Sequence, residues 1–156
     1  MTNPDPGGKG EAIRLIIEEY QIPTIINRAS GGISINREHD VNLLYITDQI
    51  PYDWILPYIY AMIHHGGSGT THMGLKYGCA SMIIPHIIDQ FVWDDIVVQA
   101  GAGPRGVSIQ HFTMSKIETK VLELLSNDIY KARAEEITQR MEVENYSPTL
   151  MNYIVS

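Results

Sequence analysis

Apolar positions along the chain follow two periods, one typical of buried strands and one typical of amphipathic helices. Short apolar runs predict strands at residues 22–27, 42–46, 60–63 and 80–85, with a small one at 106–109. Broader apolar faces predict helices at 9–20, 70–77, 89–100, 114–125, 129–143 and 146–154, and a turn of helix at 52–58. Because strands alternate with helices, we expect an α/β fold with a doubly wound, mainly parallel, Rossmann-like sheet.

Length, charge and cysteine content narrow the class of protein. A chain of 156 residues that is 44% hydrophobic can bury one sizeable core, so we expect a single domain over residues 1–156. The net charge of −7 and the lack of a dense basic patch argue against nucleic acid as a partner. The single cysteine, Cys79, suits a reducing compartment. We see no signal peptide and no apolar run near the roughly 20 residues of a membrane span, so we expect a cytoplasmic protein.

A glycine-rich turn follows the strand predicted at 60–63 and precedes the helix predicted at 70–77. A strand, a glycine turn and a helix make an anion site, because glycines allow close approach and the helix N-terminus offers free N–H groups. Hydroxyl groups and an imidazole at the turn add donors that suit a phosphate. We therefore predict a diphosphate site at His65, Gly66, Gly67, Ser68, Gly69, Thr70 and Thr71.

The histidines of this stretch admit other interpretations. His64 and His65 could be a structural pair at the end of a strand, and alternation should turn the His64 side chain to the other face. With His72 they also suggest a metal, but adjacent strand residues point apart and no cysteine or carboxylate is suitably spaced. We therefore expect neither a metal nor another cofactor. The turn matches neither the Walker loop nor the dinucleotide-binding motif.

A second candidate site follows the strand that ends at Pro85. Asp89 and Gln90 come just after it, at the carboxyl edge of the sheet, where open α/β folds bind ligands. A carboxylate and an amide can hold vicinal hydroxyls, so we predict that this pair binds a sugar. The alternative is that the two residues only cap the helix at 89–100.

Several motifs in fixed order carry a family resemblance. Residues 64–71 read His-His-Gly-Gly-Ser-Gly-Thr-Thr, and residues 74–79, 83–85 and 89–93 read Gly-Leu-Lys-Tyr-Gly-Cys, Ile-Ile-Pro and Asp-Gln-Phe-Val-Trp. Upstream, residues 50–57 read Ile-Pro-Tyr-Asp-Trp-Ile-Leu-Pro. This order resembles the donor-binding signature of UDP-sugar-dependent glycosyltransferases, most closely their sterol and macrolide/glycopeptide branch, over roughly residues 10–140.

The resemblance implies the C-terminal half of a GT-B fold, in which two Rossmann-like domains face each other. This half would hold the donor, with Pro51 and Tyr52 on the nucleobase side. The implied reaction is an inverting transfer of a hexose from a UDP-sugar to a hydroxyl of a small lipophilic acceptor. The resemblance places the catalytic base in an N-terminal acceptor domain that this sequence lacks, so no residue here is assigned as catalytic. Met73 stands where plant-type relatives carry a glutamate that holds the ribose.

Two alternatives stay open beside the transferase. The chain could be a non-catalytic UDP-sugar-binding module or a regulatory subunit, or half of a nucleotide-sugar epimerase. The Asp89–Gln90 pair and the segment at 51–54 argue against the epimerase.

The family's first strand also lies upstream of the first residue here, so we expect a truncated sheet. The strands at 22–27 and 60–63 would then have backbone N–H and C=O groups without partners. They could pair directly, residues 1–8 could fill the gap, or another chain could donate a strand. We expect an acceptor-domain partner or self-association.

Overall fold

Short parallel strands are combined with helices in the computed structural model, which describes residues 8–28, 33–35 and 37–143. The strands are β1 (Thr24–Asn27), β2 (Leu44–Thr47), β3 (Ala61–His64) and β4 (Ala80–Ile83). The helices are α1 (Lys9–Glu19), α2 (Tyr52–Ile55), α3 (Ser68–Lys76), α4 (Ile88–Ala100), α5 (Met114–Ser126) and α6 (Asp128–Val143), with 3-10 turns η1 (Leu56–Tyr58) and η2 (Ile109–His111). The predicted α/β class is confirmed. The helix predicted at 146–154 lies outside the described residues.

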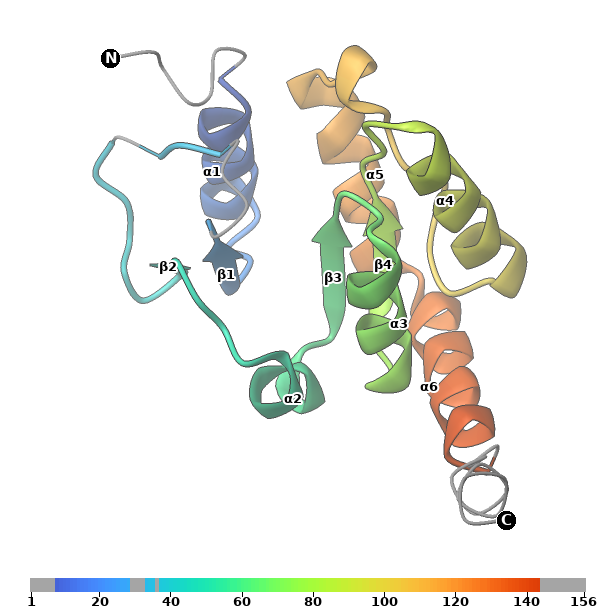
Figure 1. Ribbon diagram of the computed structural model, residues 1–156. Coiled ribbons are helices and arrows are strands. Elements are labelled where there is room, and N and C mark those ends of the chain that lie inside the picture. The colour runs from blue at the N-terminus through green and yellow to red at the C-terminus, as the bar shows by residue number, and fades with distance from the viewer. Residues whose placement is uncertain (1–7, 29–32, 36, 144–156) are drawn as a thin grey trace.

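The described strands form two parallel pairs (Figure 1). In one pair Thr24 of β1 is opposite Leu44 of β2, and in the other Ala61 of β3 is opposite Ala80 of β4. Within the described residues no ladder joins β1 to β3. Direct pairing of these two strands, one of the three arrangements expected from the sequence, is therefore not the one observed. The possibility that residues 1–8 lie between them falls largely outside the described residues.

The strand β4 lies at the centre of the larger half of the molecule. All four of its residues are buried, which is typical of a parallel strand covered on both faces. One face packs Ala80 and Met82 against α1 and α5, and the other packs Ile83 against α3, α4 and α6. A third cluster, which includes Ile17, Ile26 and Leu44, joins α1 to the β1–β2 pair.

The small strand predicted at 106–109 is wrong, because residues 101–109 run beside β4 without a regular ladder. The Ser81 N–H donates to the Ala102 carbonyl (2.9 Å) and the Ile109 N–H to the Pro85 carbonyl (3.0 Å). Between these points Pro104 has no N–H to donate. The Gly106 N–H donates instead to Asp94 Oδ1 of α4 (3.1 Å). A side chain from another element thus takes the donor that a ladder would need.

No helix in the described ranges is both long enough and apolar enough to span a bilayer.

Candidate functional site

The glycine turn connects the end of β3 to the start of α3. Gly66 has φ of 92°, a left-handed conformation that favours glycine. A Cβ at this position would lie 2.6 Å from Ile83 Cγ2 and 3.2 Å from Gln90 Cβ. The turn therefore packs directly on the end of β4 and the first turn of α4. The structure brings together the two segments that the sequence analysis assigned to the donor, the glycine turn and the Asp89–Gln90 pair.

The N-terminus of α3 is open. Its N-cap residue, Gly67, provides no side chain, and within the described residues the N–H groups of Ser68, Gly69 and Thr70 have no acceptor. The first turn of α3 also lacks an acidic residue. Every other α-helix in the described ranges has an acidic residue in its first turn or a capping side chain, namely Glu11, Asp53, Asp89, Thr113 and Asp128. The partial positive charge at the start of α3 is thus left without a compensating group.

The hydroxyl groups of the turn differ in their surroundings. Ser68 and Gly69 are exposed, and no atom lies within 4 Å of the place where a Gly69 Cβ would be. Thr70 is half-buried. Thr71 is fully buried, and both its hydroxyl and its N–H donate to the Gly67 carbonyl at 2.9 Å. The Thr71 donors hold the first turn of α3, and the predicted contact of Thr71 with a diphosphate stays a prediction.

The adjacent histidines lie in different environments, as the alternation along a strand predicts. His65 is exposed, and its Nε2 lies 2.8 Å from the place where a Gly67 Cβ would be, so its ring covers the turn. His64 is half-buried with its Nε2 shielded from solvent, and the Gly66 N–H donates to its Nδ1 (3.1 Å). Burial lowers the pKa of His64 to about 4, with a smaller contribution from His65, so the ring is neutral at physiological pH.

Two basic residues that the sequence analysis did not select lie near the turn. His86 precedes α4, and its ring centroid is 6.3 Å from that of His65. The pKa of His86 is lowered mainly by burial, and further by His65 and by Lys9 at the start of α1. His86 directly follows Pro85, at the same edge of the sheet. That position in the sequence was enough to suggest His86 as a residue of the site. Nothing in the sequence pattern indicates that Lys9 comes near.

The two predicted sugar-binding residues have different roles in the fold. The Gln90 side chain is buried, and its Oε1 accepts from the N–H groups of His86 (2.7 Å) and Ile87 (3.3 Å). Its oxygen therefore caps α4, which is the alternative that the sequence left open. Asp89 is exposed in the first turn of α4. The Asp89 carboxylate faces solvent beside the turn, and the sugar-binding role of the pair stays a prediction.

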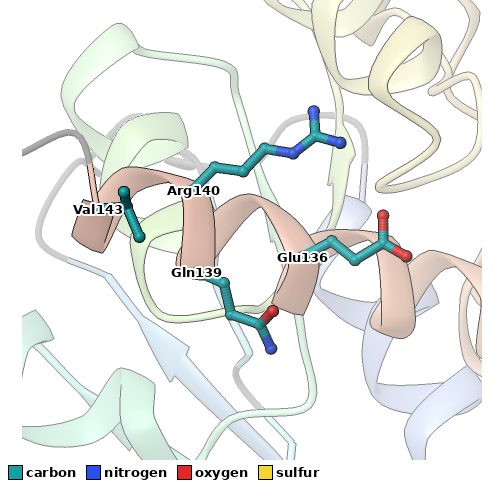
Figure 2. A pocket seen from close by; sticks show the side chains of 4 residues that line it. All are labelled: Glu136, Gln139, Arg140 and Val143. Atoms are coloured by element: carbon teal, nitrogen blue, oxygen red, sulfur yellow. The ribbon is translucent and has the colours of Figure 1, made fainter.

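A shallow depression lies on the surface of α6 (Figure 2). It is lined by Glu136, Gln139, Arg140 and Val143, which all come from that one helix. None of the predicted site residues lines it.

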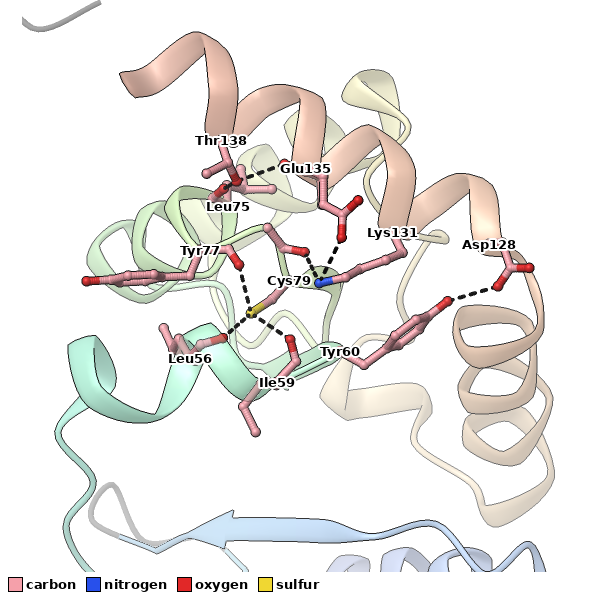
Figure 3. A network of polar contacts seen from close by, with 12 residues as sticks. Leu56, Ile59, Tyr60, Leu75, Tyr77, Cys79, Asp128, Lys131, Glu135 and Thr138 are labelled. Atoms are coloured by element: carbon pink, nitrogen blue, oxygen red, sulfur yellow. Dashed lines mark hydrogen bonds and ion pairs between the residues drawn. The ribbon is translucent and has the colours of Figure 1, made fainter. Parts of the chain in front are cut away.

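A second polar cluster lies at the amino ends of β3 and β4 (Figure 3). The Cys79 thiol donates to the carbonyls of Leu56 (3.6 Å) and Ile59 (3.5 Å), and Lys131 Nζ donates to the Gly78 carbonyl (2.7 Å). Burial raises the pKa of Cys79 to about 11, so the thiol stays protonated and can donate. This cluster joins η1 and α6 to the segment before β4.

The position of α2 locates the predicted nucleobase-side residues. Pro51 and Tyr52 begin α2, which lies near the amino end of β3, whereas the glycine turn follows the carboxyl end of that strand (Figure 1). The structure does not bring Pro51 and Tyr52 next to the turn, and their nucleobase role stays a prediction. In the described ranges no cluster of three or more His, Cys, Asp or Glu side chains has the geometry of a metal site.

Comparison with known proteins identifies relatives over most of the chain. The family model for the erythromycin biosynthesis protein CIII-like C-terminal domain matches residues 38–153. Sterol 3-beta-glucosyltransferase UGT80A2 of Arabidopsis thaliana is 35% identical over 78% of this chain, and UGT80B1 of the same plant is 28% identical over 93%. The chain spans about a fifth of the length of these curated relatives, 19% and 23%.

Solved structures show the same fold. Spinosyn rhamnosyltransferase SpnG superposes with a TM-score of 0.77 at 18% identity, covering 97% of this chain and 41% of that one. Its complex with thymidine diphosphate gives 0.76 at 17% identity, covering 96% and 41%. These likenesses support the predicted Rossmann-like half of a GT-B glycosyltransferase fold. On the family model and the order of its motifs, the chain belongs to the erythromycin biosynthesis protein CIII-like C-terminal domain family of glycosyltransferases.

Proposed function

We propose that this chain is the donor half of an inverting glycosyltransferase and that it binds the diphosphate of a UDP-sugar at the N-terminus of α3. The observation that carries the proposal is the open helix start, where the N–H groups of Ser68, Gly69 and Thr70 have no acceptor within the described residues. A helix N-terminus with free N–H groups favours a bound phosphate. The thymidine diphosphate complex of a structural neighbour supports a nucleoside diphosphate as the ligand.

The chemistry follows from where negative charge grows during transfer. As the bond from the sugar to the diphosphate breaks, the leaving phosphate gains charge. Fixed N–H donors and the helix dipole stabilise that charge because they need no reorganisation at the moment of reaction. His65, whose ring covers the turn, adds a donor on the open side.

The sugar would lie toward the first turn of α4. Asp89 is exposed there, next to the turn, and can accept hydrogen bonds from the hydroxyls of a hexose. An acceptor hydroxyl would then attack the anomeric carbon from the side opposite the diphosphate. We assign no residue of this chain as the base that deprotonates the hydroxyl.

Ser68→Pro tests the helix N–H groups directly. Ser68 is the first residue of α3, where proline is well tolerated, and Gly67 before it has φ −61° and ψ 137°, which suit a residue preceding proline. The substitution removes one free N–H without breaking the helix. We expect UDP affinity, measured by calorimetry, to fall about tenfold or more, because a hydrogen bond to a charged group contributes about 1.5–3 kcal/mol.

Ser68→Ala is the matched control, since it keeps the N–H and removes only the hydroxyl. We expect it to bind UDP much more tightly than Ser68→Pro, and His65→Ala to bind more weakly than the unmodified chain. Titration with thymidine diphosphate in parallel decides which nucleotide is preferred. No heat and no chemical-shift change with either nucleotide at millimolar concentration would refute the proposed function.

The chain alone is expected to transfer no sugar. Transfer requires a base and an acceptor held in line with the donor, and positioning of both partners supplies much of the rate. The measurement is UDP release from UDP-glucose with a sterol or a macrolide aglycone present. Release that depends on the acceptor and disappears in Asp89→Ala would show that this expectation is wrong.

A further inference from the structure

His64 contacts the glycine turn from the buried side. The Gly66 N–H donates to its Nδ1 at 3.1 Å, and Nε2 is buried with no partner in the described part of the chain. These contacts define the tautomer. If Nδ1 carried the proton, two donors would face each other, so the proton must reside on Nε2.

We propose that His64 is a positioning residue, which holds the Gly66 N–H through Nδ1 and so aims the free N–H groups of α3 at the donor diphosphate. This inference rests on the proposed function for its ligand. It assigns to His64 a role that differs from that of its neighbour, because His65 would contact the phosphate and His64 would shape the turn that receives it.

The geometry of Gly66 shows why such a residue is needed. At φ 92° the chain turns sharply out of β3, and the residue is buried between Ile83 and Gln90. Within the described residues the Gly66 N–H has no backbone acceptor, and burying it unpaired would be costly. Nδ1 of His64 supplies its acceptor from two residues earlier in the chain.

The unpaired Nε2 supports the same interpretation. Buried polar atoms without partners are rare in proteins, and an apolar side chain at this position would avoid the cost. An imidazole at this position is explained if the acceptor at Nδ1 is what the turn requires. The neutral ring is also what an acceptor role demands, since a protonated imidazole has two donors and no acceptor.

The test compares two variants of the full chain. His64→Asn places an amide oxygen near the position of Nδ1 and can accept from Gly66, whereas His64→Leu has a similar volume and no acceptor. We expect Gly66 amide exchange, followed by NMR without nucleotide, to stay slow in His64→Asn and to become at least tenfold faster in His64→Leu. UDP affinity should follow the same order, with His64→Asn within about threefold of the unmodified chain and His64→Leu weaker by about tenfold or more.

The NMR chemical shifts of the two His64 ring nitrogens in the unmodified chain provide an independent test. They should show Nε2 protonated and Nδ1 unprotonated between pH 7 and pH 5. A protonated Nδ1, or Gly66 exchange that is the same in both folded variants, would overturn the proposal. If His64→Leu does not fold, fast Gly66 exchange in His64→Asn would overturn it. If the unmodified chain does not bind nucleotide, the proposed function fails while these NMR readouts still decide the role of His64.

Discussion

Replacing Gly106 with alanine is expected to abolish cooperative folding of the chain. The added Cβ would lie 1.5 Å from the carbonyl oxygen of Ile83 and 2.7 Å from its carbonyl carbon. Both are main-chain atoms, so no side-chain rotation relieves the overlap. The segment at 101–109 and β4 would have to separate along the part of the core where β4 is buried on both faces.

The expected size of the effect follows from the rigidity of that contact. Overpacking in a core usually costs about 1–3 kcal/mol when neighbouring side chains can shift. Here the backbone of β4 must move, which also disturbs the packing of Ile83 against α3, α4 and α6. A loss well above that range removes much of a typical stability of about 5–15 kcal/mol.

Gly69→Ala is the control for this substitution. No atom lies within 4 Å of its Cβ position, and alanine favours a helix over glycine by up to about 1 kcal/mol. Urea unfolding followed by circular dichroism should show an unchanged or slightly more stable Gly69→Ala. A Gly106→Ala variant that unfolds cooperatively within about 0.5 kcal/mol of the unmodified chain would refute the packing argument.

Local signals account for the parts of the fold that the sequence predicts well. The helices at α1, α4 and α5 begin and end within one or two residues of the predicted ranges, because apolar spacing and punctuating residues such as Gly101 are local features. The segment at 106–109 alternates the apolar Val107 and Ile109 with Gly106 and Ser108, a pattern typical of a strand. Its backbone is held instead by Asp94, twelve residues away on another element, and no local pattern reports such a contact.

The candidate site likewise has features that local sequence signals predict and features that depend on contacts between distant residues. The glycine turn and its position after a strand are readable from the sequence, since positive φ and close packing both favour glycine at Gly66. Which residues of the site contact a ligand and which support the fold cannot be predicted from the sequence. Whether a threonine hydroxyl faces a ligand or its own helix, as Thr71 does, depends on the side-chain rotamer and the surrounding packing. The approach of Lys9 to His86 depends on how α1 packs against the rest of the molecule.

Asp94 and Asp95 form a natural pair for testing how the segment at 101–109 is held. Both carboxylates bind the Arg105 guanidinium, with Asp94 Oδ2 at 3.0 Å, but the Asp94 side chain is 2% exposed and that of Asp95 is 52% exposed. Only Asp94 also accepts from the Gly106 N–H. The two residues therefore share one partner and differ in burial and in the backbone contact.

Asp94→Ala is expected to lower the free energy of unfolding by about 2–4 kcal/mol. The substitution leaves the Gly106 N–H without its acceptor and removes the buried carboxylate that pairs with Arg105. Asp95→Ala should cost less than about 1 kcal/mol, since exposed ion pairs contribute little. Asp94→Asn should fall between them, because its amide oxygen can still accept from Gly106 while the charge that faces Arg105 is lost. Urea titrations at one pH and one salt concentration give the three values. Equal losses for Asp94→Ala and Asp95→Ala would mean that Arg105, and not the backbone contact to Gly106, holds the segment in place beside β4.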